Sequence, residues 1–224
     1  MKVDNKVERM NILQRYRLPI FILLTSVFYI FIIPSDPEAL KILCKLIPMW
    51  LILIYAYKQI RLHQSRTLWI IWWGLFFCML GDGLISRWFI LGLLAFLIGH
   101  LIYIAGFFRF RRLSSLALIV ILPLGVYGVV MGYHVLGALL EELNYSLALP
   151  VFIYLLVILF MCWMAFLTRN AWVIVGSILF VISDSFLSWN MFVSAVPHSD
   201  IFIMTTYYAA QFLIAHSLRF FPKT

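Results

Sequence analysis

Two aspartates, Asp82 and Asp184, lie inside apolar stretches where a carboxylate is unexpected. Near the hydrocarbon of a membrane each ionised carboxylate costs about 2.5–3.5 kcal/mol, so two of them suggest a function. If helices bring both into one pocket of low dielectric constant, they do not easily ionise together, and the pocket holds an acid and a base. The alternative is structural: each carboxylate hydrogen-bonds backbone, or pairs with Lys45 or Arg87, only to hold the helices together.

The two aspartates share a local pattern that is written twice in the chain. A glycine stands eight residues before each and a serine four residues after it: Gly74 and Ser86 for the first, Gly176 and Ser188 for the second. The immediate neighbours differ, because glycines flank Asp82 whereas Ser183 and Ser185 flank Asp184. One hypothesis is that these serine hydroxyls keep Asp184 ionised and leave Asp82 as the proton donor.

Further polar residues interrupt the apolar segments. Lys45, three residues before Pro48, can be the counter-ion of an aspartate, a phosphate anchor, or a lysine that reaches out to the membrane interface. His100 can take part in chemistry or only hydrogen-bond between helices. Tyr208 and Gln211 lie deeper in a segment than the aromatic residues that mark a membrane interface.

Several kinds of chemistry find no support in the sequence. The three cysteines, Cys44, Cys78 and Cys162, lie in apolar runs without CxxC spacing, and no histidines have the HxxxH spacing of a zinc site. There is no GxSxG, Walker or dinucleotide-binding motif. We therefore expect neither a metal nor a cofactor.

The composition is that of a polytopic membrane protein. Apolar residues make up 65% of the chain and charged residues 12%, against roughly 45–50% and 25% in soluble domains. The N-terminus has the charged and then apolar character of a signal peptide but no small-x-small cleavage site, so we interpret it as the start of the first helix. With about 20 residues per span, the sequence predicts an all-α fold with eight transmembrane helices at 18–34, 40–57, 67–86, 88–108, 114–134, 146–167, 171–190 and 199–219.

The charges test this arrangement. The net charge of +8 does not indicate nucleic-acid binding, because all but three of the 17 basic residues fall on one side of the predicted membrane; the three are Lys41, Lys45 and Arg87. The positive-inside rule then places both termini in the cytoplasm of a multi-pass protein of the cell (inner) membrane. The predicted parts are a cytoplasmic segment (1–17), one eight-helix catalytic domain (18–219) and a cytoplasmic tail (220–224).

In this topology both aspartate-bearing helices run from inside to outside, and each is third in a block of four. The chain therefore suggests two four-helix halves in parallel orientation, as known from other membrane proteins.

The combined motifs resemble the integral membrane lysoplasmalogenase family, also called the YhhN family, from about residue 40 to 215. The shared segments are Gly81-Asp82, Phe96-Leu-Ile-Gly99-His100-Leu-Ile-Tyr103, Phe180-Val-Ile-Ser183-Asp184-Ser185 and Thr206-Tyr207-Tyr208-Ala-Ala-Gln211. The family's early Lys-Pro reads Lys45-Leu-Ile-Pro48 here, which is a departure. The resemblance implies catalytic roles for Asp82 and Asp184, and substrate contacts for Lys45, His100, Tyr103, Ser183, Tyr208 and Gln211.

The resemblance also implies a reaction, the hydrolysis of the vinyl-ether bond of lysoplasmalogen to a fatty aldehyde and glycerophosphoethanolamine or glycerophosphocholine. It implies no cofactor. A vinyl ether must be protonated on carbon before water adds, so one carboxylic acid and one carboxylate suit it, as in glycoside hydrolases. The expected partners are the lysophospholipid and membrane lipids, with no obligate protein partner. Two alternatives stay open: a transporter with buried carboxylates, and a hydrolase of another lysolipid.

Overall fold

The computed structural model of the chain describes residues 2–34, 36–63, 65–112 and 115–222, with only the backbone for 2–15 and 63. The described residues form eight α-helices, followed by the short 3₁₀ helix η1 (Leu218–Phe220). The helices are α1 (Lys2–Ile32), α2 (Glu38–His63), α3 (Leu68–Leu84), α4 (Phe89–Arg109), α5 (Ser115–Glu141), α6 (Tyr145–Leu167), α7 (Ala171–Phe192) and α8 (Ser199–Ser217).

The helices follow from the apolar composition, because a chain in lipid must satisfy its backbone hydrogen bonds internally. Six of the eight, α2 and α4 to α8, are long and apolar enough to cross a membrane. The apolar parts of the other two, Tyr16–Ile32 in α1 and Leu68–Leu84 in α3, are shorter. The chain is therefore an all-α, multi-pass membrane protein, as the sequence predicts.

Two predicted helix bounds differ from the structure. Helix α1 begins at Lys2, well before residue 18, since the polar residues that end the apolar span do not end the helix. Helix α5 continues to Glu141 instead of stopping near 134. Glycine, tyrosine and histidine at 132–134 weaken the apolar signal there without breaking the helical backbone.

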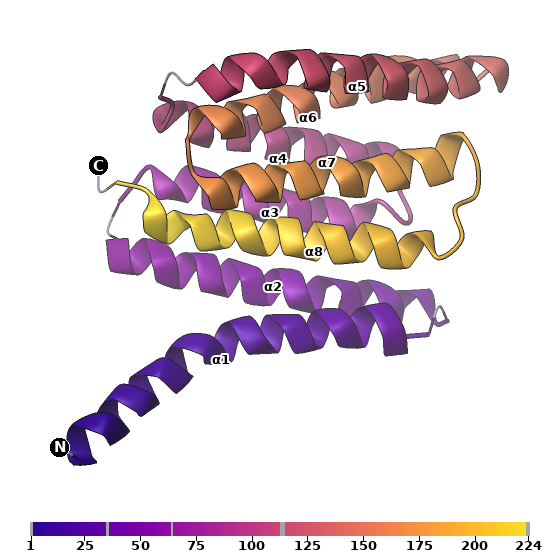
Figure 1. Cartoon of the computed structure of the whole chain (residues 1–224). Coiled ribbons are helices and arrows are strands. Elements are labelled where there is room, and N and C mark those ends of the chain that lie inside the picture. Colours follow the sequence, from indigo (N-terminus) through magenta and orange to yellow (C-terminus); the bar gives the residue numbers. More distant parts are fainter. Residues whose placement is uncertain (1, 35, 64, 113–114, 223–224) are drawn as a thin grey trace.

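The helices lie side by side in a bundle whose two edges are α1 and α5 (Figure 1). The most extensive contacts are those of the hairpin partners α3 with α4 and α7 with α8. Helix α5 packs mainly on α6 and less on α7, and it is the least buried of the six long helices. The polar centre described below lies between these hairpins and α2, α5 and α6.

Repeated glycines allow the hairpin helices to approach closely. A Cβ at Gly74 would lie 2.5 Å from the ring of Tyr103 on α4. A Cβ at Gly176 would lie 3.0 Å from the carbonyl oxygen of Ala210 on α8. The glycine that precedes each aspartate by eight residues thus serves helix packing, and it fixes how the helix carrying that aspartate seats against its partner.

Candidate active site

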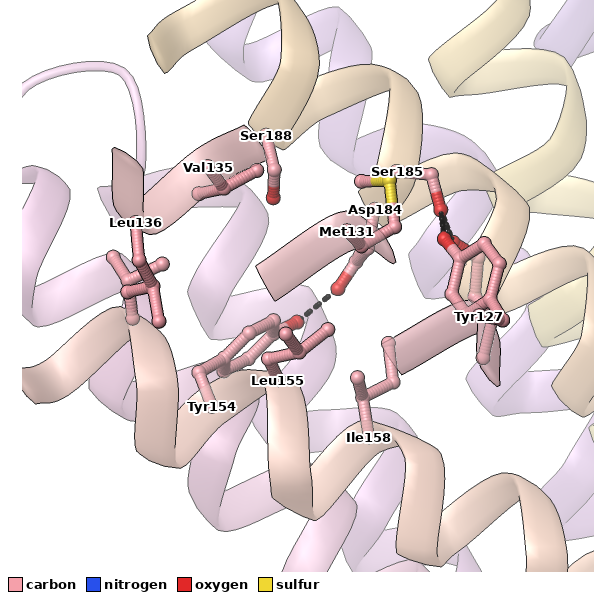
Figure 2. Close-up of a pocket in the computed structure, with 12 residues that line it drawn as sticks. Tyr127, Met131, Val135, Leu136, Tyr154, Leu155, Ile158, Asp184, Ser185 and Ser188 are labelled. Atoms are coloured by element: carbon pink, nitrogen blue, oxygen red, sulfur yellow. Dashed lines mark hydrogen bonds between the residues drawn. The ribbon is translucent and has the colours of Figure 1, made fainter. Parts of the chain in front are cut away.

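Asp184 lines a cavity enclosed by α5, α6 and α7 (Figure 2). The cavity has a volume of about 30 Å³ and mainly aliphatic walls, among them Met131, Val135, Leu155 and Ile158. The Asp184 residue is 9% exposed. Its Oδ2 accepts a hydrogen bond from the hydroxyl of Tyr154 on α6. A carboxyl group fixed by a phenol in an apolar chamber can exchange a proton with a lipid that enters the chamber.

A second cavity, of about 20 Å³, lies on the other side of the same pair of residues. Asp184 and Tyr154 line it together with Val151 and Ser188, which also belong to the first cavity. Its remaining walls come from the α3–α4 turn, the first half of α4 and the end of α7: Ile85, Phe89, Leu93, Phe96, Leu187, Met191 and Phe192. The Asp184–Tyr154 pair therefore stands where two small apolar chambers meet.

The serines beside Asp184 bond elsewhere, so the hypothesis that their hydroxyls keep it ionised is wrong. Ser183 Oγ donates to the carbonyl of Ile203 on α8 at 3.0 Å. Ser185 Oγ donates to the carbonyl of Val181 and is hydrogen-bonded to the hydroxyl of Tyr127 on α5. The two side chains project from α7 to either side of Asp184, because neighbouring residues on a helix point about 100° apart.

Asp82 has a different environment. Lys45 Nζ lies 3.0 Å from Asp82 Oδ1, and both side chains are largely buried. Of the roles open to Lys45, the structure thus shows the counter-ion, while Arg87 lies 3.7 Å from Glu38 at the surface. Asp82 Oδ2 is buried and has no hydrogen-bond partner within the described part of the chain.

The two aspartates belong to one polar centre without being equivalent. Phe96 links their surroundings: a Cβ at Gly81, next to Asp82, would lie 2.6 Å from its ring, and Phe96 lines the second cavity together with Asp184. Only Asp184, however, is among the residues that line the two cavities. The aspartate with access to a ligand is therefore Asp184, and Asp82 with Lys45 forms a charged pair behind it.

His100 is fully buried next to Tyr154, which lines both cavities. Its Nδ1 is hydrogen-bonded to the carbonyl of Phe96 at 2.6 Å, and its ring stands edge-on to Tyr154 with centroids 5.4 Å apart. Nε2 has no partner among the described residues. The imidazole thus packs against the tyrosine that holds Asp184, and it makes no direct hydrogen bond to the carboxyl group.

Three other residues expected to bind substrate hold helices together instead. Tyr103 donates to Gln211 Oε1 at 2.7 Å, which joins α4 to α8. Tyr208 donates to the carbonyl of Lys45 at 2.8 Å, which joins α8 to α2 beside the ion pair. Neither these three residues nor Ser183 is among the residues that line the two cavities.

The cavity walls contain polar residues that the sequence did not rank as site residues. Tyr154, Tyr127, Ser185 and Ser188 all line the first cavity. The sequence does indicate Tyr154 as a candidate, because it is a tyrosine in the middle of an apolar helix, whereas the link between Tyr127 and Ser185 depends on how α5 and α7 meet. Among the residues that the structure describes, no three His, Cys, Asp or Glu side chains gather as metal ligands would.

Comparisons with known proteins agree with this picture. The sequence model of the YhhN family matches residues 40–218. The chain is 36% identical over 131 residues to lysoplasmalogenase TMEM86B of Homo sapiens, which covers 58% of this chain and 53% of that protein. It is 31% identical over 212 residues to lysoplasmalogenase TMEM86A of Bos taurus, which covers 86% and 84%. The match thus spans about half of human TMEM86B and most of bovine TMEM86A. No solved structure matches the chain.

Proposed function

Because this chain belongs to the YhhN family, we propose that it is a lysoplasmalogenase, which hydrolyses the vinyl-ether bond of a lysoplasmalogen within the membrane. The products are a fatty aldehyde and glycerophosphoethanolamine or glycerophosphocholine. The names of the curated relatives support this activity. The observation that carries the proposal is the carboxyl group of Asp184, which Tyr154 holds at the junction of two apolar chambers. The apolar walls suit contact with an alkenyl chain, and the carboxyl group suits its reactive end.

In the first step Asp184 acts as the general acid. Its proton passes to the β-carbon of the vinyl ether, and the double bond becomes an oxocarbenium ion at the carbon attached to oxygen. The hydrogen bond from Tyr154 to Oδ2 orients the carboxyl group and stabilises the carboxylate that the step leaves behind. A saturated alkyl ether has no double bond that can accept the proton on carbon, so it is not a substrate of this mechanism.

In the second step the Asp184 carboxylate acts as the base. A water molecule adds to the cationic carbon and gives its proton to the carboxylate, which regenerates the acid. The resulting hemiacetal collapses as its bond to the glycerol oxygen breaks, the hydroxyl proton leaves, and the glycerol oxygen is protonated. One carboxyl group that alternates between acid and base follows the logic of retaining glycosidases.

Asp82 and Lys45 supply the charged pair of the site. Lys45 Nζ lies 3.0 Å from Asp82 Oδ1, so the two side chains form a buried ion pair. In the proposed reaction Asp82 contributes the negative charge of this pair. The same charge also stabilises the cationic intermediate. His100 fixes the Tyr154 ring from the side, and Lys45 is bound to Asp82 and does not serve as a phosphate anchor.

The proposal is tested with purified protein in detergent, incubated with a lysoplasmalogen while the release of aldehyde is measured. Asp184→Asn and Asp82→Asn should each lower the rate by about 100-fold or more, the low end for general acid–base catalysis. Asp200→Asn is the matched control, because Asp200 is an exposed aspartate paired with Lys41. No aldehyde from the wild-type protein, or normal turnover by a folded Asp184→Asn protein, contradicts the proposal. Release of fatty acid from an acyl lysolipid instead indicates a different hydrolase.

We further propose that all eight helices cross the membrane, with both termini in the cytoplasm of a cell (inner) membrane protein. The apolar segments of α1 and α3 are near the lower limit of about 17 residues for a span. Figure 1 supports this topology, because the N-terminal part of α1 and the 3₁₀ helix η1 lie toward the same end of the bundle. In this topology residues 1–17 and 220–224 flank one catalytic domain of residues 18–219.

We also propose that α1–α4 and α5–α8 are two parallel repeats. The neighbours support this proposal, because α3 pairs with α4 as α7 pairs with α8, and α2 contacts α8 as α6 contacts α4. The outer helices depart from the pattern: α1 contacts α8, whereas α5 contacts α7. The departure coincides with the chambers at Asp184, which lie on the α5 side.

A further inference from the structure

An apolar groove runs along the outer surface of α5 and α6. On α5 its lining extends from Gly125 to Leu140, and on α6 from Phe152 to Leu159. Its volume is about 630 Å³. Between Gly125 and Leu140 a helix rises about 22 Å, which exceeds the roughly 15 Å of hydrocarbon in one leaflet. The groove therefore has the length and the character needed for a lipid chain.

Two leucines join this groove to the chamber of Asp184. Leu136 on α5 and Leu155 on α6 line both the groove and the chamber. Figure 2 shows both leucines in the chamber wall, with Tyr154 and Asp184. The side chains of these two leucines thus stand between the bilayer side of α5–α6 and the chamber of the carboxyl group.

Two glycines on α5, Gly125 and Gly137, leave the groove open because they have no side chain. A Cβ placed at Gly125 or Gly137 would have no atom within 4 Å, so nothing in the described structure fills the space beside them. Helix α5 also buries the least surface of the six long helices.

We propose that this groove binds the alkenyl chain of the lysolipid substrate, which enters the chamber sideways from the bilayer between Leu136 and Leu155. The inference rests on the proposed function and deepens it, because it assigns the tail to the α5–α6 side and makes the groove the measure of chain length. The vinyl-ether end lies at Asp184, and the chain runs through the leucine pair and along the groove toward Gly125. Chains too short to pass the leucines do not reach the groove.

The first experiment compares Gly125→Phe with the wild-type protein on lysoplasmalogens whose alkenyl chains have about 18 or about 8 carbons. The benzyl group fills the far end of the groove, so KM for the long chain should rise roughly tenfold, as expected when a few buried methylenes are displaced. KM for the short chain, and kcat for both, should stay unchanged. Val130→Phe is the matched control, because Val130 lies on α5 at a similar depth, is half exposed and does not line the groove.

Equal effects of Gly125→Phe on both substrates, or no effect on either, overturn the proposal. Val129→Trp is the second variant, because Val129 lines the groove but not the chamber of Asp184, and it should likewise raise KM for the long chain alone. Retained short-chain turnover shows in each case that the protein is folded and that the chemistry is intact.

A binding experiment separates the groove from the proposed reaction. The probe is an alkyl-ether lysophosphatidylethanolamine with a diazirine at the end of its chain, which this mechanism cannot cleave. Photolabelling should mark peptides of α5 and α6 around Gly125 and Leu159, excess lysoplasmalogen should suppress it, and Gly125→Phe should reduce it severalfold. Labelling that competitor and variant leave unchanged is contact with bulk lipid and refutes the groove. Labelling that behaves as expected, with no aldehyde released, refutes only the reaction.

Discussion

At the residue scale, the two aspartates of the repeated pattern differ in what lies next to them. Asp184 accepts from Tyr154 and faces the cavities, whereas Asp82 pairs with Lys45 and is covered. In the proposed reaction their surroundings divide the work between a carboxyl group that meets the substrate and a charged pair behind it. Similar backbone positions thus supply different chemistry, because partner side chains on other helices decide the environment of each carboxylate.

Removal of the Tyr154 hydroxyl should impair the reaction without unfolding the protein. Tyr154→Phe keeps the ring that packs on His100 but deletes the donor to Asp184. A hydrogen bond to a charged group contributes about 1.5–3 kcal/mol, so kcat should fall tenfold or more, with little change in KM. Tyr133→Phe, at an exposed tyrosine of α5, is the control for loss of a hydroxyl. A normal kcat in Tyr154→Phe would show that the hydroxyl has no part in the chemistry.

Loss of Lys45 should destabilise the protein far more than loss of Lys41 on the same helix. Lys45→Met leaves Asp82 buried without its cation, which costs about 3–5 kcal/mol. Lys41→Met breaks the exposed pair with Asp200, which contributes about 0–1 kcal/mol. Thermal unfolding in detergent measures both, and the double variant Lys45→Met/Asp82→Asn should recover much of the loss. Equal melting temperatures for the two lysine variants would contradict a stabilising role of the buried pair.

At the element scale, close contacts within the hairpins position the helices that carry the site. The α3–α4 hairpin is closed by Gly92, whose missing side chain makes room for the backbone of Ile85. On α7, Gly176 likewise makes room for the backbone of Ala210 on α8, which positions the helix that carries Asp184. The periphery is looser, because α5 has glycines with open space beside them. Tight hairpins thus hold the carboxyl groups, while the loosely held α5 forms the wall nearest the bilayer.

Alanine substitutions at two glycines should have opposite effects on stability in the tight α3–α4 hairpin and in the peripheral helix α5. Gly92→Ala places a Cβ 2.6 Å from the Cα of Ile85, so backbone must move and the melting temperature should fall by several degrees. Gly125→Ala meets no atom within 4 Å and gains helix propensity of about 0.8–1 kcal/mol, so its stability should be unchanged or higher. Thermal unfolding checks both. The reverse order of stabilities would show that the α3–α4 turn relaxes freely.

At the scale of the whole molecule, the distribution of basic residues is the basis for the proposed orientation of the helices in the membrane. All but three of the basic residues fall on the side that we assign to the cytoplasm. In that orientation Asp184 lies in the outer half of α7, and the groove of α5 and α6 runs from the outer end toward the middle of the membrane. The substrate chain then comes from the outer leaflet.

Fusions at the chain ends should test this orientation. A green fluorescent protein at either terminus should fluoresce, and alkaline phosphatase at either terminus should be inactive, because the proposed topology places both ends in the cytoplasm. A cysteine introduced at Asn144, between α5 and α6, should react with an impermeant maleimide from outside in a background without the three native cysteines. Active phosphatase at one end only would mean an odd number of spans and would refute the eight-span topology.

The sequence alone determined the broad architecture and the family. Long apolar runs specify helices because lipid leaves the backbone no other partner. The repeated pattern also identified Asp82 and Asp184 as a pair, and Lys45 as a possible counter-ion. What it could not show is which side each residue faces. In helices that are apolar nearly all round, the pattern of apolar residues carries little information about the buried face.

The tertiary structure decided the roles. Tyr154 meets Asp184 across α6 and α7, Lys45 reaches Asp82 from α2, and Tyr103 and Gln211 bond each other across α4 and α8. These contacts depend on the rotation and depth of each helix, and side-chain packing between segments distant in the chain sets both. Only the folded bundle therefore distinguishes the aspartate that faces a cavity from the aspartate that supports it.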